Sequence, residues 1–516
     1  MEPENIKLYQ APQARKPDVE DFRQISSDLH LGCSEEDLQN FTKYAAKITE
    51  SLSAVALLPD PAAERVRYPR TPGYRPVPEE NPHNAWAWKC DIRGSPEGKL
   101  AGRMIAIKDN VAVAGVPMRN GSRIFENYVP EFDATIVTRI LNAGGIIVGK
   151  TAVSDLCLEG SCLTNIDGPV RNAVDDTRIA GGSSGGSGAL VAGGHVYMAI
   201  GGDQGGSIRI PASFNGIVGL KPTYGLVPYT GACSIDVTID HLGPMTRTVH
   251  DCALLLEVIA GYDDGRDGRQ FPNTPTAEYS KLINVSVEGK KVGLLKEGFD
   301  ICVDEIKTIV RQAADRLTEA GMVVMETSIP EHRDGPKIWM ATGGFGVYNC
   351  MVRGNGVGWS KGYYPLSMMD AAFRGYKTYP QDLPPLVKFF AMYNEYIGRL
   401  YGNRFFAKGQ NLILGLTGVY DMALEEFDVL VMPTLPFAAP KIPPADCSFE
   451  EFASVSLSMC DNCMPFNSTG HPALTINAGY TAEDKLPVGL MIVGKKFDEV
   501  TVLQVARALE MILSEK

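Results

Sequence analysis

Residues 181–207 have the sequence Gly-Gly-Ser-Ser-Gly-Gly-Ser-Gly-Ala-Leu-Val-Ala-Gly-Gly-His-Val-Tyr-Met-Ala-Ile-Gly-Gly-Asp-Gln-Gly-Gly-Ser. Eleven of the chain's 53 glycines lie here, together with four serines, Ser183, Ser184, Ser187 and Ser207. Glycine lets backbone approach a ligand closely and adopt conformations that other residues avoid. Acyl-transfer enzymes need backbone amides as oxyanion donors with a nucleophile beside them. The segment therefore predicts an enzyme site built from amides and serine hydroxyls.

The composition is that of a globular protein. Of 516 residues, 44% are hydrophobic and 21% are charged, and the length predicts one large domain with additions, or two or three domains. The net charge of −12 argues against nucleic acid or an anionic membrane as the main partner. We expect no signal peptide and no membrane anchor, because no suitable apolar stretch is present. Eleven cysteines, an odd number, favour reduced thiols in a cytoplasmic protein.

Helical and strand patterns follow one another along the chain. Residues 17–58 have apolar side chains at helical spacing, with Ser34 as an N-cap. Residues 59–100 are rich in proline and polar residues and predict an extended connector. We expect a helical N-terminal module with the start of the connector over residues 1–75, and the main domain over residues 76–516. In that domain strands alternate with helices, which predicts an α/β fold whose large mixed β-sheet is flanked by helices on both faces. The expected strands are residues 104–107, 146–148, 196–200, 292–295, 323–325, 429–432 and 490–493, and the expected helices include 134–143, 303–320 and 498–513.

Two other motifs suggest different chemistry. Gly144–Thr151 matches the phosphate-binding pattern GxxxxGK[ST], but a helical stretch precedes it and its apolar interior is typical of a strand. We expect a helix, a turn and a strand in the core there.

Gly181–Gly185 fits the GxSxG pattern of serine hydrolases, whose nucleophile directly follows a core strand. A polar segment, residues 172–178, precedes it instead, and no later histidine has a distinctive setting. His241, beside Asp240, is expected in a turn.

Further sequence blocks accompany the glycine-rich segment. Lys108 directly follows an apolar strand, a position where a lysine is usually a solvated strand end. Other blocks lie before and after Ser207 in a fixed order. They are Gly168-Pro169-Val170-Arg171-Asn172, Gly205-Gly206-Ser207-Ile208-Arg209-Ile210-Pro211-Ala212, Gly219-Leu220-Lys221-Pro222-Thr223, Gly225-Leu226-Val227-Pro228, Asp240-His241-Leu242-Gly243-Pro244, Val431-Met432-Pro433-Thr434 and Gly470-His471-Pro472-Ala473.

Together these blocks resemble the amidase signature family. The resemblance extends from about residue 85 to the end, and the whole chain looks most like the enantioselective amidases that act after nitrile hydratase. The family carries a Ser–cis-Ser–Lys triad, and its positions match Ser207, Ser183 and Lys108, with the two serines 24 positions apart. The resemblance thus implies that residues 76–516 are an amidase signature catalytic domain.

The resemblance implies amide hydrolysis through a serine acyl-enzyme. Ser207 would be the nucleophile, Ser183 the proton relay and Lys108 the base, which must be neutral and therefore needs a lowered pKa. The oxyanion hole would use the backbone amides of Gln204, Gly205, Gly206 and Ser207. An apolar substrate pocket is expected from Leu158, Ile239, Trp339 and Cys460. Neither a cofactor nor a metal ion is implied.

The implied substrate is a small-molecule amide, and the resemblance suggests a homodimer. One alternative is an amidotransferase A-type subunit, which supplies ammonia to a partner; the N-terminal helices and Gln204 favour a free-standing amidase. Family members that prefer anilides, carbamates or fatty amides also remain open. The intact Lys108, Ser183 and Ser207 disfavour a binding protein without activity.

Overall fold

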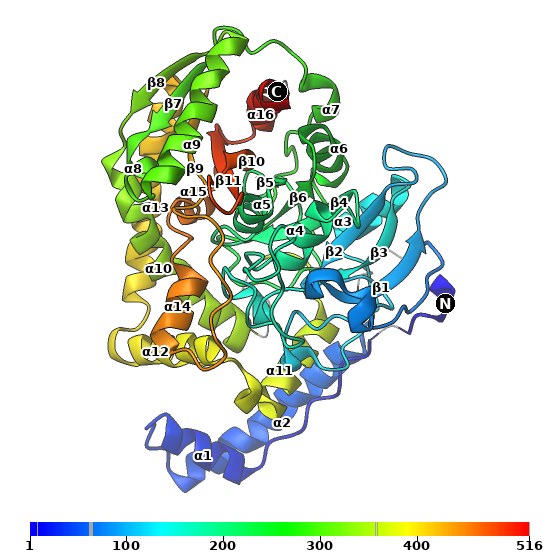
Figure 1. Ribbon diagram of the computed structural model, residues 1–516. Coiled ribbons are helices and arrows are strands. Elements are labelled where there is room, and N and C mark those ends of the chain that lie inside the picture. Colours follow the sequence, from blue (N-terminus) through cyan, green and yellow to red (C-terminus); the bar gives the residue numbers. More distant parts are fainter. Residues whose placement is uncertain (8, 61–65, 355, 357, 359, 515–516) are drawn as a thin grey trace.

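In the described part of the computed structural model, eleven strands form one mixed β-sheet (Figure 1). The structure describes residues 1–516 except 8, 61–65, 355, 357, 359 and 515–516. The strand order is β1-β3-β2-β4-β6-β5-β10-β11-β9-β7-β8. The strands are β1 Trp86–Arg93, β2 Met104–Lys108, β3 Ile146–Thr151, β4 Met198–Asp203, β5 Val218–Lys221, β6 His241–Thr246, β7 Lys291–Leu295, β8 Val323–Thr327, β9 Val429–Pro433, β10 Ala473–Tyr480 and β11 Pro487–Gly494.

The sheet combines parallel and antiparallel pairs. β2 runs parallel to β3 and β4, and β7 runs parallel to β8 and β9. The other paired strands are antiparallel, including β10 with both β5 and β11. Every residue of β4, β9 and β11 is buried, as expected for strands covered on both faces. The predicted α/β fold with a mixed sheet is confirmed.

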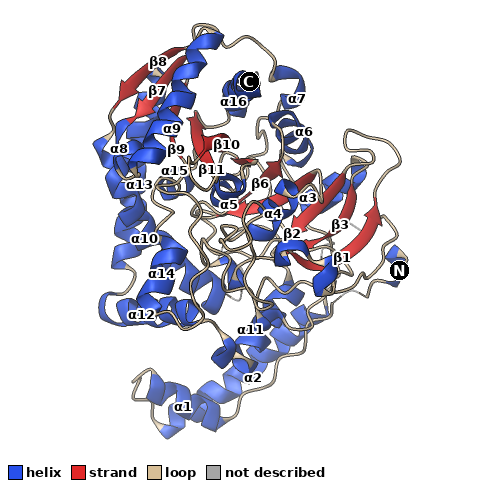
Figure 2. Cartoon of the chain, in the orientation of Figure 1, coloured by secondary structure: helices blue, strands red, loops and turns tan. Residues whose placement is uncertain are grey.

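Two groups of helices cover this sheet (Figure 2). α4 and α5 pack against each other, α4 against β2 and β4 and α5 against β5, β10 and β11. α3, α6, α9 and α16 form a second connected group, in which α6 contacts β6 and α16 contacts β10 and β11. The helices are α1 Val19–Asp28, α2 Glu35–Leu57, α3 Thr135–Asn142, α4 Gly185–Ala192, α5 Arg209–Asn215, α6 Val249–Ile259, α7 Tyr279–Leu282, α8 Lys296–Asp300, α9 Asp304–Asp315, α10 Gly335–Gly346, α11 Leu366–Thr378, α12 Pro385–Tyr401, α13 Arg404–Glu426, α14 Phe449–Leu457, α15 Met464–Thr469 and α16 Glu499–Ser514.

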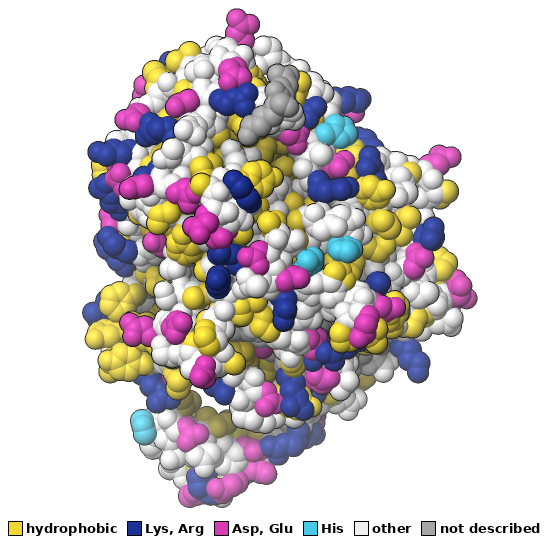
Figure 3. Space-filling model, viewed as in Figure 1, with side chains coloured by type: hydrophobic (Ala, Val, Ile, Leu, Met, Phe, Trp, Pro, Cys, Tyr) yellow, Lys and Arg dark blue, Asp and Glu magenta, His cyan; other side chains and the backbone are white. Residues whose placement is uncertain are grey.

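A helical hairpin, α1 and α2, projects from the main body at the bottom of Figure 1. Both helices begin with a capping box, from Asp18 in α1 and from Ser34 in α2, so the predicted N-cap at Ser34 is confirmed. α2 exposes a row of large apolar side chains, Phe41, Tyr44, Ile48, Leu52 and Val55. Apolar side chains also gather at the left edge of Figure 3, over α12, where Phe389, Tyr393 and Tyr396 are exposed and their rings adjoin.

The structure corrects two predicted elements. Part of the expected connector, Trp86–Arg93, forms β1 at the sheet edge, paired with β3, while residues 61–65 of that connector lie outside the described residues. The turn expected at Asp240–Pro244 is wrong, because His241–Thr246 form β6 between β4 and β5. In both places pairing with a neighbouring strand outweighs a weak or unfavourable local preference for strand.

Candidate active site

Lys108 is the last residue of β2, and its side chain is fully buried. Its Nζ donates to Ser183 Oγ at 2.8 Å and to the Gly202 carbonyl oxygen at 3.0 Å. Among the described residues no carboxylate forms an ion pair with it, since the adjacent Asp109 pairs with Lys150. Burial lowers the pKa of the Lys108 amine, because the charged form loses its hydration. The side chain therefore has the environment of a lysine that can act as a base.

Ser183 lies in the turn that leads into α4. The peptide bond between Gly182 and Ser183 is cis, and the Gly182 N–H donates to the Gly160 carbonyl oxygen at 2.6 Å. A Cβ on Gly182 would lie 2.7 Å from the Cys162 backbone nitrogen, so only glycine fits there. Ser184 N–H donates to the Ser207 carbonyl oxygen at 3.3 Å. This contact joins the turn of Ser183 directly to the loop that carries Ser207.

Asp203 organises the loop between β4 and α5, which carries Ser207. Its carboxylate accepts the backbone N–H groups of Gly206 (2.7 Å) and Ile208 (3.1 Å) and an ion pair from Arg209 at 3.0 Å. Asn467 of α15 donates to the same carboxylate at 2.8 Å. Burial alone would raise the pKa of Asp203, but the Arg209 guanidinium and the other donors bring it below its usual range.

The three predicted catalytic residues come from three separate segments that meet here. Lys108 and Ser183 are fully buried, whereas Ser207 is 8% exposed. Among the described residues the Ser207 hydroxyl has no hydrogen-bond partner, although its backbone carbonyl is engaged by Ser184. The Lys108–Ser183 hydrogen bond and the backbone contact between Ser184 and Ser207 thus bring the three segments together.

The amides predicted for the oxyanion hole belong to this same loop. The Gly206 N–H is engaged by Asp203, and Gly206 has φ of 125°, a conformation that favours glycine. The Gln204 carbonyl oxygen accepts from Trp339 Nε1 at 2.7 Å. Gln204 Nε2 donates to the Tyr229 hydroxyl at 3.0 Å. The loop is therefore held from both sides, by Asp203 within it and by Trp339 of α10.

The predicted pocket residues lie in two places around this loop. A Cβ on Gly343 would lie 2.9 Å from Trp339 and 3.0 Å from Ile239, which places these side chains together. Cys460 Sγ would lie 3.4 Å from a Cβ on Gly160, the residue that accepts from Gly182. Leu158 packs, half-buried, on a hydrophobic cluster that includes Leu156 and Cys157. That all four line one substrate pocket stays a prediction.

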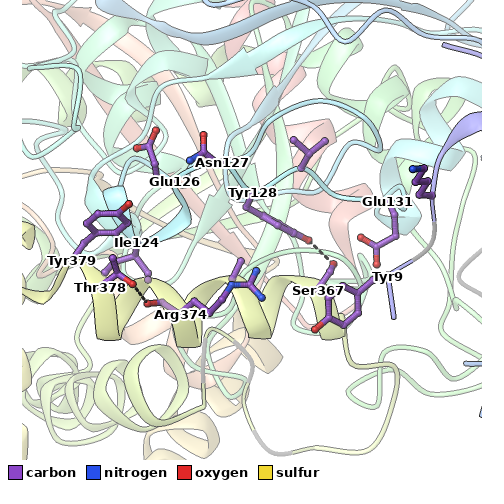
Figure 4. Close-up of a pocket in the computed structure, with 14 residues that line it drawn as sticks. Tyr9, Ile124, Glu126, Asn127, Tyr128, Glu131, Ser367, Arg374, Thr378 and Tyr379 are labelled. Atoms are coloured by element: carbon purple, nitrogen blue, oxygen red, sulfur yellow. Dashed lines mark hydrogen bonds between the residues drawn. The ribbon is translucent and has the colours of Figure 1, made fainter. Parts of the chain in front are cut away.

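A cavity of about 520 Å³ lies where the N-terminal segment crosses α11 (Figure 4). Tyr9 lies beside Glu131 and Ser367, and the Tyr128 hydroxyl and Ser367 Oγ are 3.1 Å apart. Tyr9 also forms a hydrogen bond with Asp370 of α11. None of the three predicted catalytic residues lines this cavity. Lys7 and Tyr9 of the N-terminal segment contribute to its lining.

The competing motifs have structural roles. Gly144–Thr151 contain a turn and the core strand β3, as expected, and Lys150 Nζ lies 2.9 Å from Asp109 Oδ1. His241 Nδ1 lies 2.7 Å from the Ile239 carbonyl oxygen. No strand directly precedes Gly181, as a serine-hydrolase nucleophile turn would require.

Within the described ranges, no group of three His, Cys, Asp or Glu side chains could hold a metal ion. No described helix is both long enough and apolar enough to cross a membrane.

One residue of the site was missed by sequence reasoning. Asn467 braces Asp203 from 264 positions away in the chain. It has no local sequence signal, because the folding of a distant segment brings it to the site.

Comparison with known proteins gives the context of this geometry. The family model described as Amidase matches residues 73–503. An enantioselective amidase of Rhodococcus rhodochrous is 41% identical over 501 residues, which cover 95% of this chain and 95% of that protein. The A-type subunit of the glutamyl-tRNA(Gln) amidotransferase of Methanosarcina acetivorans is 34% identical over 472 residues, which cover 89% of this chain and 96% of that protein.

Solved structures agree with the sequence relatives. The structure of 6-aminohexanoate cyclic dimer hydrolase is 27% identical, with a TM-score of 0.71, and the match covers 81% of this chain and 86% of that chain. The peptide amidase in complex with the competitive inhibitor chymostatin is 26% identical, with a TM-score of 0.68, and the match covers 80% and 84% of the two chains. From its family model, its relatives and its fold, the chain belongs to the amidase family of amide-hydrolysing enzymes.

Proposed function

We propose that this enzyme hydrolyses a small carboxylic amide to an acid and ammonia or an amine through a serine acyl-enzyme. The observation that carries the proposal is the buried Lys108 amine, 2.8 Å from Ser183 Oγ and without a carboxylate partner in the described part of the chain. Such an amine can be neutral near physiological pH and accept a proton. We propose Lys108, Ser183 and Ser207 as the catalytic residues.

In the first half of the reaction, Ser207 Oγ forms a bond to the substrate carbonyl carbon. The Ser207 proton passes to Ser183, whose own proton passes to Lys108. When the tetrahedral intermediate collapses, the carbon–nitrogen bond breaks and the leaving nitrogen takes a proton back through Ser183. A water then attacks the acyl-enzyme, gives its proton to the same relay, and releases the acid while Ser207 is reprotonated.

The negative charge on the substrate oxygen is stabilised by the loop before α5. We propose the N–H groups of Gln204, Gly205, Gly206 and Ser207 as donors. The Gly206 N–H is already engaged by Asp203 at 2.7 Å, so it would be shared with the oxyanion. The acyl group would lie against Leu158, Ile239, Trp339 and Cys460, which suit a small aromatic or branched amide.

A panel of primary amides, anilides and carbamates tests the activity and the substrate class. We expect Ser207→Ala to lose several orders of magnitude in kcat, and hydroxylamine to trap the acyl group from the wild type as a hydroxamate. Ser187→Ala is the matched control, because Ser187 lies in the same segment and its hydroxyl donates a hydrogen bond to the Ile200 carbonyl oxygen. We expect this variant still to form the acyl-enzyme. Substantial amidase activity in Ser207→Ala would refute the assignment of the nucleophile.

The alternative, an A-type amidotransferase subunit, is supported by the 34% identity to such a protein. The two N-terminal helices and the 41% identity to an enantioselective amidase over 95% of the chain favour a free-standing amidase. Turnover of simple amides by the purified chain alone supports this choice. Turnover only in the presence of a partner complex would favour the amidotransferase alternative.

We also propose that residues 1–75 form a module distinct from the catalytic domain, residues 76–516, and that the enzyme is a cytoplasmic homodimer. The exposed apolar row on α2 supports an interface between copies. The eleven cysteines are all unpaired, which supports a reducing compartment. Light scattering coupled to size exclusion tests the assembly, and a monomeric mass at micromolar concentration would contradict it.

A further inference from the structure

Glu159 is a buried carboxylate in the loop between β3 and α4, with 3% of its surface exposed. Its two oxygens accept the backbone N–H groups of residues 161–164, at distances from 2.5 to 3.4 Å. The hydroxyls of Ser161 and Thr164 donate to the same carboxylate. All of these donors are neutral, so hydrogen bonds rather than a cation compensate the buried charge.

The loop forms an anion-binding nest that its own side chain fills. Successive backbone N–H groups converge on one point where the chain passes through a left-handed conformation, and Cys162 has a φ of 65°. A carboxylate binds well in such a nest, because several N–H dipoles point at one charge. An uncharged side chain at position 159 would leave some of these N–H groups without an acceptor. The carboxylate of Glu159 therefore fixes the conformation of residues 159–164.

One peptide unit of this loop leads directly to the turn of Ser183. The Ser161 N–H donates to Glu159, and the Gly160 carbonyl is the other half of the same planar unit. That carbonyl oxygen accepts the Gly182 N–H, with 2.6 Å between nitrogen and oxygen. A negative charge at the N–H end of a peptide makes its carbonyl oxygen a stronger acceptor. The Glu159 carboxylate thus strengthens the bond that holds Gly182, the residue before Ser183.

Two further contacts join this loop to Gly182. The Ser154 hydroxyl donates to the Glu159 carbonyl oxygen at 2.9 Å, and a Cβ on Gly182 would lie 2.8 Å from that oxygen. The Gly160 N–H is anchored separately, on a carbonyl oxygen of α14 at 2.9 Å. Because two successive carbonyls of the loop lie against Gly182, a displacement of the loop also displaces Ser183.

We propose that Glu159 is a positioning residue: its carboxylate holds the loop so that the Ser183 hydroxyl stays 2.8 Å from the Lys108 amine. The inference rests on the proposed function, in which Ser183 carries protons between Ser207 and Lys108. Within the described residues Glu159 forms no hydrogen bond with these three side chains, so it acts through the backbone of Gly182. A displaced Ser183 slows each step that passes a proton along the relay.

The first experiment compares Glu159→Gln with the wild type on a primary amide and on the p-nitrophenyl ester of the same acid. The leaving nitrogen of the amide needs a proton through Ser183, whereas p-nitrophenolate leaves without one. We expect kcat/KM to fall about tenfold to a hundredfold on the amide, part of the usual contribution of general acid–base catalysis. The loss on the ester is at least about fivefold smaller. A merely structural loss of folded enzyme lowers both values by the same factor.

Glu297→Gln is the matched control. Glu297 of α8 is also a buried carboxylate, and it accepts the Ile329 N–H at 2.9 Å and the Ser328 hydroxyl at 2.6 Å. We expect this variant to keep kcat/KM within about twofold on both substrates. Wild-type activity in Glu159→Gln overturns the proposal, and so does an equal loss on amide and ester at unchanged Tm.

A milder pair of variants keeps the carboxylate in place and needs only the amide. Thr164→Val removes the hydroxyl that donates to Glu159 Oε1 at 3.1 Å, whereas Thr164→Ser retains it. We expect kcat to fall about threefold to tenfold in the valine variant, with KM within about twofold, and to stay at the wild-type value in the serine variant. Equal kcat in the two folded variants overturns the inference. A wild type without amide hydrolysis, or an active Ser207→Ala, would instead refute the proposed function.

Discussion

Two buried lysines lie at the same edge of neighbouring parallel strands, and their side chains have different partners. Lys108 ends β2 and Lys150 lies one residue before the end of β3, and both are fully buried. Lys150 lies 2.9 Å from the Asp109 carboxylate, whereas Lys108 contacts a serine hydroxyl and a carbonyl oxygen. Burial lowers the pKa of Lys108. The two lysines thus differ because the Asp109 carboxylate pairs with Lys150 and not with Lys108. Lys150 has a structural role in this ion pair, whereas Lys108 is a candidate base.

The difference shows why sequence position alone does not assign a lysine. Asp109 follows Lys108 directly, but alternation along an extended chain directs its side chain away from that amine. Its carboxylate accepts from Lys150 and from the Arg119 N–H at 3.0 Å. Asp109, the carboxylate nearest to Lys108 in the sequence, therefore forms its ion pair with Lys150 of the neighbouring strand β3 instead.

Replacing each lysine by methionine tests the comparison most directly. We expect Lys108→Met to lose about four orders of magnitude in kcat or more, because the proton acceptor is gone. Lys150→Met, where it folds, keeps kcat within about tenfold, since Lys150 contacts none of the predicted catalytic residues. Steady-state kinetics on a primary amide measure kcat of both variants. Equal losses of kcat would contradict the different roles of the two lysines.

We expect the opposite order for the free energy of unfolding, with the larger loss in Lys150→Met. Lys150→Met leaves the buried Asp109 carboxylate without its cation, which costs about 3–5 kcal/mol of unfolding free energy. Adding Asp109→Asn to this variant restores a large part of the loss, because the uncompensated charge is gone. Urea unfolding of the single and double variants measures the effect. A single variant as stable as the wild type would contradict the structural role of the pair.

The lowered pKa of Lys108, caused by its burial, predicts a pH-dependent stability. Below that pKa the folded protein must hold a buried ammonium, so the wild type is less stable than Lys108→Met, by about 1.4 kcal/mol for every tenfold loss in the proton affinity of the amine. As pH rises from the lowered pKa toward the ordinary lysine value, this difference shrinks. Unfolding of both proteins across that range checks the sign, and a constant difference would contradict it.

The smallest expected effect concerns the loop in front of Lys108. Trp339→Phe removes the 2.7 Å hydrogen bond to the Gln204 carbonyl oxygen and keeps an aromatic ring. We expect kcat/KM to fall about fivefold, the equivalent of one hydrogen bond of about 1 kcal/mol. Phe389→Leu, on the exposed face of α12, is the control. An unchanged kcat/KM in Trp339→Phe would mean that the bond does not hold the loop.

Strong local patterns allowed most of the sheet to be predicted. The strand expected at residues 104–107 is β2, those at 146–148 and 429–432 lie in β3 and β9, and the last helix is α16. β6 was missed because His241–Thr246 include a glycine and a proline, and only its partners β4 and β5 hold it in the sheet. Helix α4 likewise begins in a run of glycines and is stabilised by packing against α5 and β4.

The site could be predicted only where the chain itself carries a pattern. Lys108, Ser183 and Ser207 were identified through a family resemblance, and the structure brings their segments together. Asn467 could not be found in this way, because an asparagine gains its role only from the neighbours that the fold supplies. Asp203 and Arg209 brace the loop through their 3.0 Å ion pair, which links two residues six positions apart in the chain.

The order of strands in the sheet has a consequence for the enzyme during its own synthesis. All three candidate catalytic residues have left the ribosome's active centre once residue 207 is made. β10 and β11 lie between β5 and β9 in the sheet and are the last strands to be translated. Asn467, which donates a hydrogen bond to Asp203, is translated just before them. The nascent chain therefore contains its three candidate catalytic residues early, whereas the segments that complete the sheet and brace Asp203 are translated only near the end.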